Sequence, residues 1–488
     1  MTNNLIGLIL TFFYIALTIA TSTILQKLKL FSDESSRKFI HIAVSNCWIF
    51  VMIFFDNIWL ACIPPIAFII LNYISYKYDL IKSMEGGKKK SFGTVYYPIS
   101  LLILVLITFW LDMTYLGAVG ILILGYGDGL AGLIGNKYGK KKLFYDKTIV
   151  GTTTMFIASL IVSFVVLTIF TPSIAIAGSL VLAIIATMIE LFTPRDLDNL
   201  SVPLGSAAVY FGLITIGSVM VNILLIAIIL NGVVAIVAFK RKSLDLSGVI
   251  AALVVGVSIY MFAGPITWVI LMLFFTTSSI ITHIKQTHKA RLSPEYEKSK
   301  RNYKQVIASG LVPTVFSILY YFTKSDIMLL TAVSAIAISC SDTWASELGI
   351  LNKGKTVLIT TLKSVKKGES GGISLLGTIM SVAGSFMIAV SFTLCQFIFF
   401  NLPLSSILYY VSSIAVIGVI GCFIDSIFGA TIQAKYIGSK TKLVTESKKS
   451  NGKQNQRISG LSFMNNDMVN LTSSIIGGIG AFIFFTVF

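Results

Sequence analysis

Two aspartates inside long apolar stretches are the residues of this sequence best suited to carry out chemistry. Asp128 lies in the run GDGLAGLIG at 127–135 and Asp342 in the run SDTWASELG at 341–349, so both share the pattern D-x-x-A-x-x-x-G. A carboxylate at membrane depth is costly and marks a functional site by default. We therefore expect Asp128 and Asp342 to be catalytic residues, metal ligands or both.

A Lys-rich loop follows each aspartate and leads into a helix start rich in glycine, serine and threonine. Backbone N–H groups at such a helix start, with lysines beside them, are typical of a phosphate site. The predicted nucleotide-binding residues are Lys137, Lys147, Gly151 and Thr152 in the first stretch and Lys363, Lys367, Gly371, Gly372 and Ser374 in the second.

Further acidic and amide side chains gather near the ends of apolar stretches. Carboxylate and amide oxygens are the ligands that Mg²⁺ takes, usually together with substrate phosphates. Asp198 could instead act only as a helix cap. The predicted metal ligands are Asp128, Glu190, Asp198 and Asn199 in the first half and Asp342, Glu347 and Asp425 in the second.

A basic pair precedes the second apolar stretch. Arg37 and His41 are one helical turn apart and would face the same way. Arg37 and Lys38 at a helix start could hold a phosphate. Ordinary basic flanking of a membrane span, with a histidine at the interface, explains the same residues equally well.

The elements that position these residues are membrane-spanning helices. Hydrophobic residues make up 55% of the chain and charged residues 12%, and only helices can span a membrane with such long apolar runs. We predict an all-α polytopic membrane protein of about 16 spans (14–16), with a turn near Gly217–Asn222 in the apolar block 202–239. The recurring motif predicts two parallel, related halves of about eight spans, residues 1–218 and 219–488.

The net charge of +17 follows from the membrane topology. With the amino terminus outside, the loops on the cytoplasmic side hold every lysine and arginine except Lys324. This distribution predicts both termini outside, the sites on the cytoplasmic face and, most simply, the cell membrane as the location. Contact with anionic membrane lipids explains the charge, so it does not indicate nucleic-acid binding.

The motifs resemble two families of prenol-processing membrane proteins. The first half resembles the dolichol/phytol kinase family of CTP-dependent polyprenol kinases. The second half resembles the TMEM-type (DUF92) membrane family that includes phytyl-phosphate kinase. The residues that carry the first resemblance are Arg37, Lys38, His41, Gly127-Asp128, Ala131, Gly135, Lys147-Thr148, Gly151-Thr152, Glu190, Asp198-Asn199 and Pro203. Those that carry the second are the run 341–349, Ile359-Thr360-Thr361, the run 371–377, Asp425-Ser426 and Gly429-Ala430.

The resemblance implies a bifunctional salvage kinase. One half would phosphorylate a polyprenyl alcohol of the phytol, farnesol or geranylgeraniol type, and the other would phosphorylate the monophosphate. It also implies CTP as phosphoryl donor and Mg²⁺ as cofactor, with both prenyl substrates drawn from the bilayer. Activating a hydroxyl requires a base, for which Asp128 and His41 are candidates, whereas a phosphate acceptor requires none.

Two other functions fit part of the pattern. A transporter with two rocking halves fits the span number and the parallel repeat, but the acidic residues gather near span ends and not at mid-depth. A membrane cytidylyltransferase that makes a CDP-lipid would use the same polar side chains and would release pyrophosphate. No Walker A run and no H-R-D signature occurs, so a nucleotide fold of the soluble type is not expected.

Overall fold

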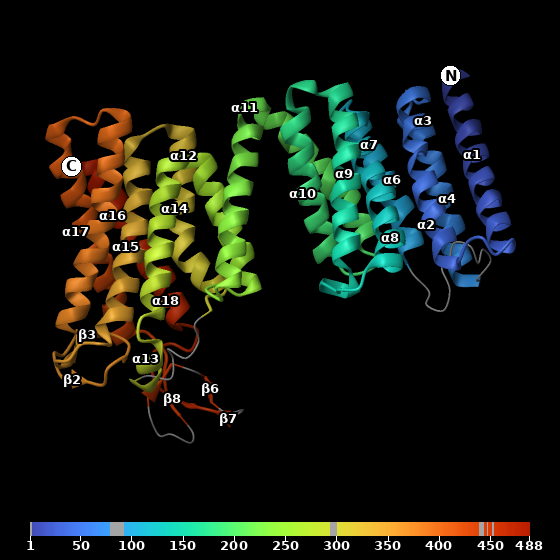
Figure 1. The fold of residues 1–488 in the computed structure, drawn as a ribbon. Helices are drawn as coiled ribbons and strands as arrows, with labels where there is room; N and C mark the ends of the chain where they lie inside the picture. The colour runs from blue at the N-terminus through green and yellow to red at the C-terminus, as the bar shows by residue number, and fades with distance from the viewer. Residues whose placement is uncertain (1, 79–91, 293–299, 439–443, 447, 451–452) are drawn as a thin grey trace. The chain divides into compact units, whose positions relative to one another are not determined.

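The computed structural model describes residues 2–78, 92–292, 300–438, 444–446, 448–450 and 453–488. Parts of the predicted loops at 77–94, 284–304 and 435–467 lie outside these residues. The described chain is helical almost throughout (Figure 1), and fourteen of its helical stretches are long and apolar enough to cross a membrane. The predicted all-α polytopic membrane fold is confirmed.

The chain divides into two compact units, Met1–Leu225 and Ile226–Phe488. The division falls within the long helix α11 (Asp198–Lys240), as does the predicted boundary between residues 218 and 219. The functions predicted for the two domains stay predictions. The remaining helices of the first unit are α1 (Thr2–Lys27), α2 (Asp33–Ser45), α3 (Cys47–Phe54), α4 (Ile58–Tyr78), α6 (Gly93–Trp110), α7 (Thr114–Leu122), η1 (Ile123–Asp128), α8 (Gly129–Tyr138), η2 (Phe144–Asp146), α9 (Ile149–Phe170), η3 (Pro172–Ile174) and α10 (Ala175–Phe192).

The second unit consists mainly of long helices. They are α12 (Leu246–His283), α13 (Gln286–Leu292), α14 (Tyr303–Thr323), α15 (Asp326–Gly349), α16 (Leu375–Phe400), α17 (Leu404–Thr431) and α18 (Asn466–Val487). Two described helices are interrupted at a glycine with positive φ, α11 at Gly217 (φ 78°) and α12 at Gly264 (φ 81°). Such a backbone suits glycine, and the break at Gly217 confirms the turn predicted there.

The second break reverses the direction of the chain. The hydroxyls of Ser243, before α12, and Ser279, near its end, lie 2.9 Å apart, so the two ends of α12 meet. Residues 246–263 and 265–283 are therefore antiparallel arms of a hairpin. Counting each interrupted helix as two spans would give the predicted sixteen.

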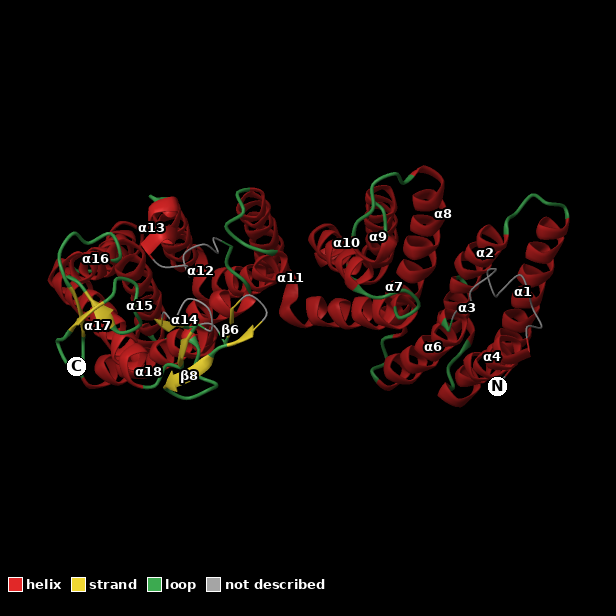
Figure 2. Ribbon diagram, turned by 90° about the horizontal axis from the view of Figure 1, so that it is seen from below, coloured by secondary structure: helices red, strands yellow, loops and turns green. Residues whose placement is uncertain are grey.

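Short strands cover one end of the second unit (Figure 2). The loop after α15 forms an antiparallel sheet in the order β2-β1-β3, with Val357 opposite Ile373. The loop after α17 forms a second sheet, in the order β5-β4-β8, and a separate two-stranded pairing of β6 with β7. The strands are β1 (Thr356–Leu358), β2 (Ser364–Val365), β3 (Gly372–Ile373), β4 (Lys435–Ile437), β5 (Val444–Thr445), β6 (Lys449–Ser450), β7 (Lys453–Gln454) and β8 (Gln456–Ser459).

One helix occupies the centre of each unit. Among the described spans, Thr114–Tyr138 is the most buried of the first unit and Asp326–Gly349 the most buried of the second. In the second unit, α15 packs against α14, α16, α17 and α18, around a core that includes Val333, Ile336 and Phe392. Asp128 and Asp342 therefore both lie on a central helix.

Candidate active sites

Asp128 ends a short π-helical segment inside its span. The segment η1 joins α7 to α8, and single π turns inside α-helices are frequent at functional sites. Glycines flank the aspartate and allow neighbouring helices to come close. A Cβ atom at Gly127 would lie 2.6 Å from the Sδ atom of Met155 on α9, so a larger residue there would require the Met155 side chain to move.

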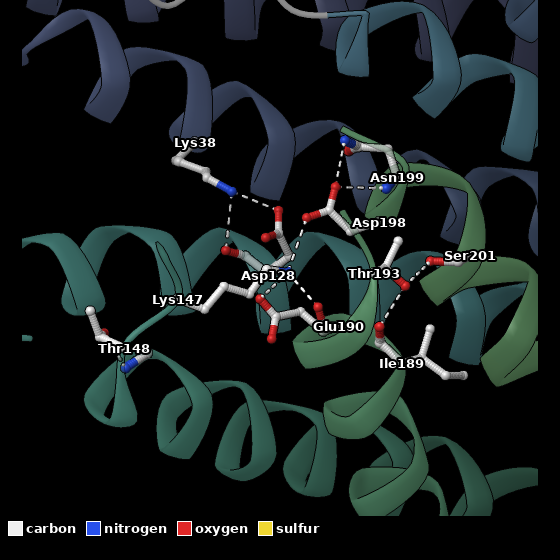
Figure 3. Close-up of polar contacts among 11 residues, drawn as sticks. Lys38, Asp128, Lys147, Thr148, Ile189, Glu190, Thr193, Asp198, Asn199 and Ser201 are labelled. Carbon is white, nitrogen blue, oxygen red and sulfur yellow. Dashed lines mark hydrogen bonds and ion pairs between the residues drawn. The ribbon is translucent and has the colours of Figure 1, made fainter. Parts of the chain in front are cut away.

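A lysine neutralises Asp128. The Lys38 Nζ atom on α2 lies 2.6 Å from Asp128 Oδ2 and also donates to the main-chain oxygen of Asp128, at 3.2 Å (Figure 3). Both side chains are buried, each about one-tenth exposed. A buried pair of this kind is costly to break from one side. Lys38, which the sequence suggested as a phosphate ligand, holds the carboxylate in this structure.

A second lysine lies among the other carboxylates of the first unit. Lys147 Nζ is 2.7 Å from Glu190 Oε1 and 3.3 Å from Asp198 Oδ2, and it donates to the Glu190 main-chain oxygen (Figure 3). Burial disfavours its charged form, but the charges of Glu190, Asp198 and Asp128 outweigh burial and hold the pKa of Lys147 above its ordinary value. Lys147 is therefore a permanent cation at physiological pH.

These groups line one cavity of about 410 Å³. Among the described residues, six buried polar atoms on its wall have no hydrogen-bond partner in the protein, namely Thr11 Oγ1, Arg37 Nε, His41 Nε2, Tyr97 OH, Thr152 Oγ1 and Glu190 Oε2. Buried polar groups are normally paired, so unpaired donors and acceptors on a cavity wall indicate a polar ligand. The cavity thus has the side chains of a binding site for an anionic, polar molecule.

Helices α8 and α9 cross in close contact beside Asp128. Thr148 caps α9, accepting from Gly151 N at 3.1 Å, and its hydroxyl lies 3.4 Å from the Gly135 main-chain oxygen at the end of α8. A Cβ atom at Gly151 would lie 3.0 Å from the Ala131 main-chain oxygen. The alanine and glycine of the sequence pattern are therefore the contact surface of this crossing.

Helices α15 and α16 cross in the same way beside Asp342. Ser374 caps α16, accepting from Gly377 N at 3.2 Å and donating to the Gly349 main-chain oxygen at 3.2 Å. A Cβ atom at Gly377 would lie 3.3 Å from the Ala345 main-chain oxygen. Ser374 thus corresponds to Thr148. Whether the two halves are related throughout stays a prediction.

Removing either cap hydroxyl should weaken its crossing. We expect Thr148→Ala and Ser374→Ala each to destabilise the protein by about 1 kcal/mol, because a helix start loses its side-chain acceptor. Thermal unfolding of the purified protein measures the change. Thr431→Ala is the control, since the exposed Thr431 hydroxyl donates only within its own helix, to Ile427. Equal melting temperatures for all three variants would contradict the structural role of the caps.

The second cavity, of about 320 Å³, has Asp342 and Asp425 on its wall together with Glu347, Gly371, Gly372 and Ser374. Ser473 on α18 donates to Asp425 Oδ1 at 2.7 Å. Arg301 also lines the cavity, and its main-chain N–H and C=O bond to Ser243 O and Asp245 N. Burial lowers the pKa of this guanidinium, and the charges of Glu347 and Asp342 oppose the shift. The site therefore combines carboxylates with one fixed cation.

Glu347 is held by an ion pair of its own. Lys289 on α13 is fully buried, and its Nζ atom lies 2.7 Å from Glu347 Oε2, while Thr282 donates to Glu347 Oε1 at 3.0 Å. Lys289 Nζ also donates to the main-chain oxygen of Ile281, at 2.8 Å. Glu347 was predicted as a metal ligand, and in this structure both of its oxygens have protein partners.

Breaking this pair from the lysine side should be costly. We expect Lys289→Ala to destabilise the protein by about 3 kcal/mol, because it leaves the Glu347 carboxylate buried without its cation. The double variant Lys289→Met/Glu347→Gln should recover most of the stability, since it leaves no unpaired charge. The melting temperatures of the two variants, measured by thermal unfolding, test this expectation. If the double variant melts no higher than the single one, the pair does not anchor α13.

Most predicted site residues line one of the two cavities. The first cavity gathers His41, Asp128, Lys147, Gly151, Thr152, Glu190, Asp198 and Asn199, and the second gathers Asp342, Glu347, Gly371, Gly372, Ser374 and Asp425. Three predicted lysines lie outside the cavity walls. Lys137 and Lys363 are exposed, and Lys367 donates to the Asn352 main-chain oxygen. Their role in nucleotide binding stays a prediction.

The sequence reading missed Arg301, Lys289 and the pairing of Lys38 with Asp128. Arg301 and Lys289 lie in a polar loop with many other basic residues, where no spacing distinguishes them. Lys38 and Asp128 are 90 positions apart in sequence. Only the tertiary packing brings them together.

The donor set suits a magnesium ion that is bound partly by substrate. Among the described residues, no three acidic, histidine or cysteine side chains come together as a complete metal cage. Mg²⁺ commonly takes one or two carboxylates, with water and phosphate oxygens completing its shell. The unpaired Glu190 Oε2 atom, with Asp128 and Asp198 nearby on the cavity wall, provides such a partial set.

Among the described residues, fourteen long apolar helices define the molecule as an integral membrane protein, and charged side chains line part of each of its two cavities. A family model described as integral membrane protein DUF92 matches residues 229–478, which is more than half of the chain. The chain belongs to this family.

Several curated proteins are similar to this chain. Protein PGR of Arabidopsis thaliana is 33% identical over 274 residues, covering 52% of this chain and 93% of that protein. A phytol kinase of Synechocystis is 31% identical over 202 residues, covering 40% of this chain and 86% of that enzyme. Protein VTE6 of Arabidopsis thaliana is 28% identical over 245 residues, covering 49% and 64%. No solved structure matches the chain.

Proposed function

We propose that this chain is a bifunctional prenol kinase. Its first unit would phosphorylate a prenyl alcohol, and its second unit would phosphorylate the resulting monophosphate to the diphosphate. One repeated arrangement carries the proposal: an aspartate on a central helix, beside a helix start capped by Thr148 or Ser374, on the wall of a cavity with polar side chains. The similarity to a protein named phytol kinase supports the substrate class.

Phosphoryl transfer asks a protein mainly for positioning and charge neutralisation. In the first unit, Lys147 and the Thr152 hydroxyl, whose oxygen has no partner among the described residues, would face the phosphates of a nucleoside triphosphate, CTP in our proposal. Asp128, Glu190 and Asp198 would hold Mg²⁺, which neutralises phosphate charge. Lys38 would turn from Asp128 toward a phosphate oxygen as the nucleotide enters.

The first step then needs a base. The prenol oxygen attacks the γ-phosphorus, the bond from that phosphorus to the bridging oxygen breaks, and a nucleoside diphosphate leaves. The hydroxyl proton would pass to His41, whose buried Nε2 atom has no partner among the described residues and lies on the cavity wall. Asp128 is the alternative acceptor, but Lys38 already holds one of its oxygens.

The second step needs no base, because a phosphate oxygen is the nucleophile. Asp342 and Asp425 would bind Mg²⁺, while Arg301 and the main chain at Gly371–Gly372 would face phosphate oxygens. The attacking phosphate oxygen forms a bond to the γ-phosphorus, the bond from that phosphorus to the bridging oxygen breaks, and a nucleoside diphosphate leaves. The polar side chains of both cavities lie next to the basic loops, and following the positive-inside rule we propose that they face the cytoplasm.

Incubating the purified protein with a prenol and a panel of γ-labelled nucleoside triphosphates tests the proposal. We expect labelled monophosphate first and diphosphate second, with CTP as the best donor. Release of pyrophosphate with a CDP-lipid would identify a cytidylyltransferase instead. Uptake into proteoliposomes without any transfer would identify a transporter.

A further inference from the structure

The first cavity has an apolar arm that continues away from the polar groups. Beyond His41, its wall follows one stripe of α2 and α3 through Val44, Trp48 and Val51 to Phe55. These positions are three or four residues apart, so they lie on one face of the helical stretch. From His41 to Phe55 the stripe is about 21 Å long at 1.5 Å per residue. This stripe of the cavity wall is therefore long and apolar.

Three other helices complete the walls of the arm with the same spacing. Thr11, Ile15 and Ile19 of α1 line it from one side, and α4 and α6 contribute further apolar residues such as Phe68 and Leu101. An apolar cavity of this shape suits an extended hydrocarbon chain whose polar end lies at His41. Burial of apolar surface would stabilise such a chain along its whole length.

The far end of the arm is closed. Phe55 is only 8% exposed, and a Cβ atom at Gly7 would lie 2.7 Å from its ring, so the ring packs against α1. Just beyond it, Asn4 bonds to the side chain of Asp56 and accepts from the main-chain N–H of Asp56 at 3.1 Å. This polar cluster ties α1 to the α3–α4 turn and leaves the arm with a fixed floor.

The second cavity lacks such an arm. Its described wall is mostly polar or small, with Gln305, Ser309, Thr378 and Ser381 near the carboxylates. A prenyl tail bound there would have to lie outside the cavity. Discrimination among prenyl chains by their length would therefore take place in the first cavity.

We propose that the apolar arm is a length gauge for the prenyl chain, with Val51 and Phe55 as specificity-determining residues for the first step. This inference rests on the proposed prenol substrate. A chain longer than the arm meets the ring of Phe55, and a shorter chain leaves part of the arm unfilled. The arm thus favours one range of chain lengths.

The test measures binding and turnover separately for geraniol, farnesol, geranylgeraniol and phytol. Binding is followed by prenol-induced thermal stabilisation without nucleotide, and turnover by monophosphate formation. Val51→Trp places a bulky ring across the arm. It should weaken binding of the four-unit alcohols about tenfold or more relative to geraniol, the scale at which an apolar pocket discriminates. Phe55→Leu should shift the preference toward longer chains.

Ile53→Trp is the matched control, because Ile53 lies on the same helix but is 64% exposed on the outer face. It should keep the wild-type length profile. If Val51→Trp leaves the dependence of binding on chain length unchanged, or weakens the binding of all four alcohols equally, the length gauge is wrong. If the wild type shows length-dependent binding without phosphate transfer, the gauge stands and the proposed kinase activity fails.

Discussion

The Asp342→Asn protein is expected to convert a prenol to its monophosphate and to stop there. Asp342 lies on the central helix of the second unit and faces the second cavity together with Asp425 and Arg301. Removing its charge should slow the second transfer about 100-fold or more, as removal of one preorganised electrostatic group does in other enzymes. The first transfer uses residues of the other unit and should keep its rate. Labelled monophosphate should therefore accumulate.

Chromatography of labelled products over time measures this effect. Asp326→Asn, at the exposed start of α15 and outside the wall of the second cavity, is the matched control and should give the wild-type ratio of mono- to diphosphate. Loss of both products in Asp342→Asn would mean that the two steps share one site. A normal yield of diphosphate would mean that Asp342 has no part in transfer.

The Lys147→Met protein is expected to lose the first step. Lys147 is the cation between Glu190 and Asp198, and its raised pKa keeps it charged through neutral and mildly alkaline pH. Without it, Asp128, Glu190 and Asp198 would face the incoming phosphates with one counter-charge fewer. We expect monophosphate formation to fall about 100-fold or more. Since the group is charged well above pH 7, raising the pH to 9 should not produce the same loss in the wild type.

Lys142→Met is the matched control for this variant. Lys142 lies in the same loop, but its pair with Asp146 is exposed, with side chains 68% and 84% accessible, so it contributes little. Turnover of the prenol with each nucleotide is the measurement. Equal losses in the two variants would assign the effect to the general charge of the loop and not to Lys147.

Sequence patterns were enough to locate the spans, the break at Gly217 and the two aspartates. These features depend on local properties, namely apolar length, backbone freedom at glycine and the cost of a buried charge. The apolar stretch around Asp128 contains no signal for the π-helical turn, which lies in contact with α2 and α9.

The partners of the charged groups could not be predicted from the sequence. Glu347 is a good metal ligand by type, yet its partner Lys289 comes from a short helix 58 positions earlier. The correspondence of Ser374 with Thr148 was also hidden, because the two intervening loops differ in length and only the second forms a sheet. The hydrogen bonds to the main-chain oxygens of Gly135 and Gly349 show which residues correspond, whereas the three identical residues of the sequence pattern do not.

The most direct measurement supplies the Asp128→Asn protein with either the prenol or the prenyl monophosphate, together with labelled nucleotide. Its folding is checked against Lys38→Met/Asp128→Asn, which leaves no unpaired charge in the Lys38–Asp128 pair. With two separate sites acting in sequence, the variant should form no product from the alcohol and should convert the monophosphate to diphosphate at the wild-type rate. Loss of activity toward both substrates in a folded protein, or retention of both, would contradict the division of the two steps between the units.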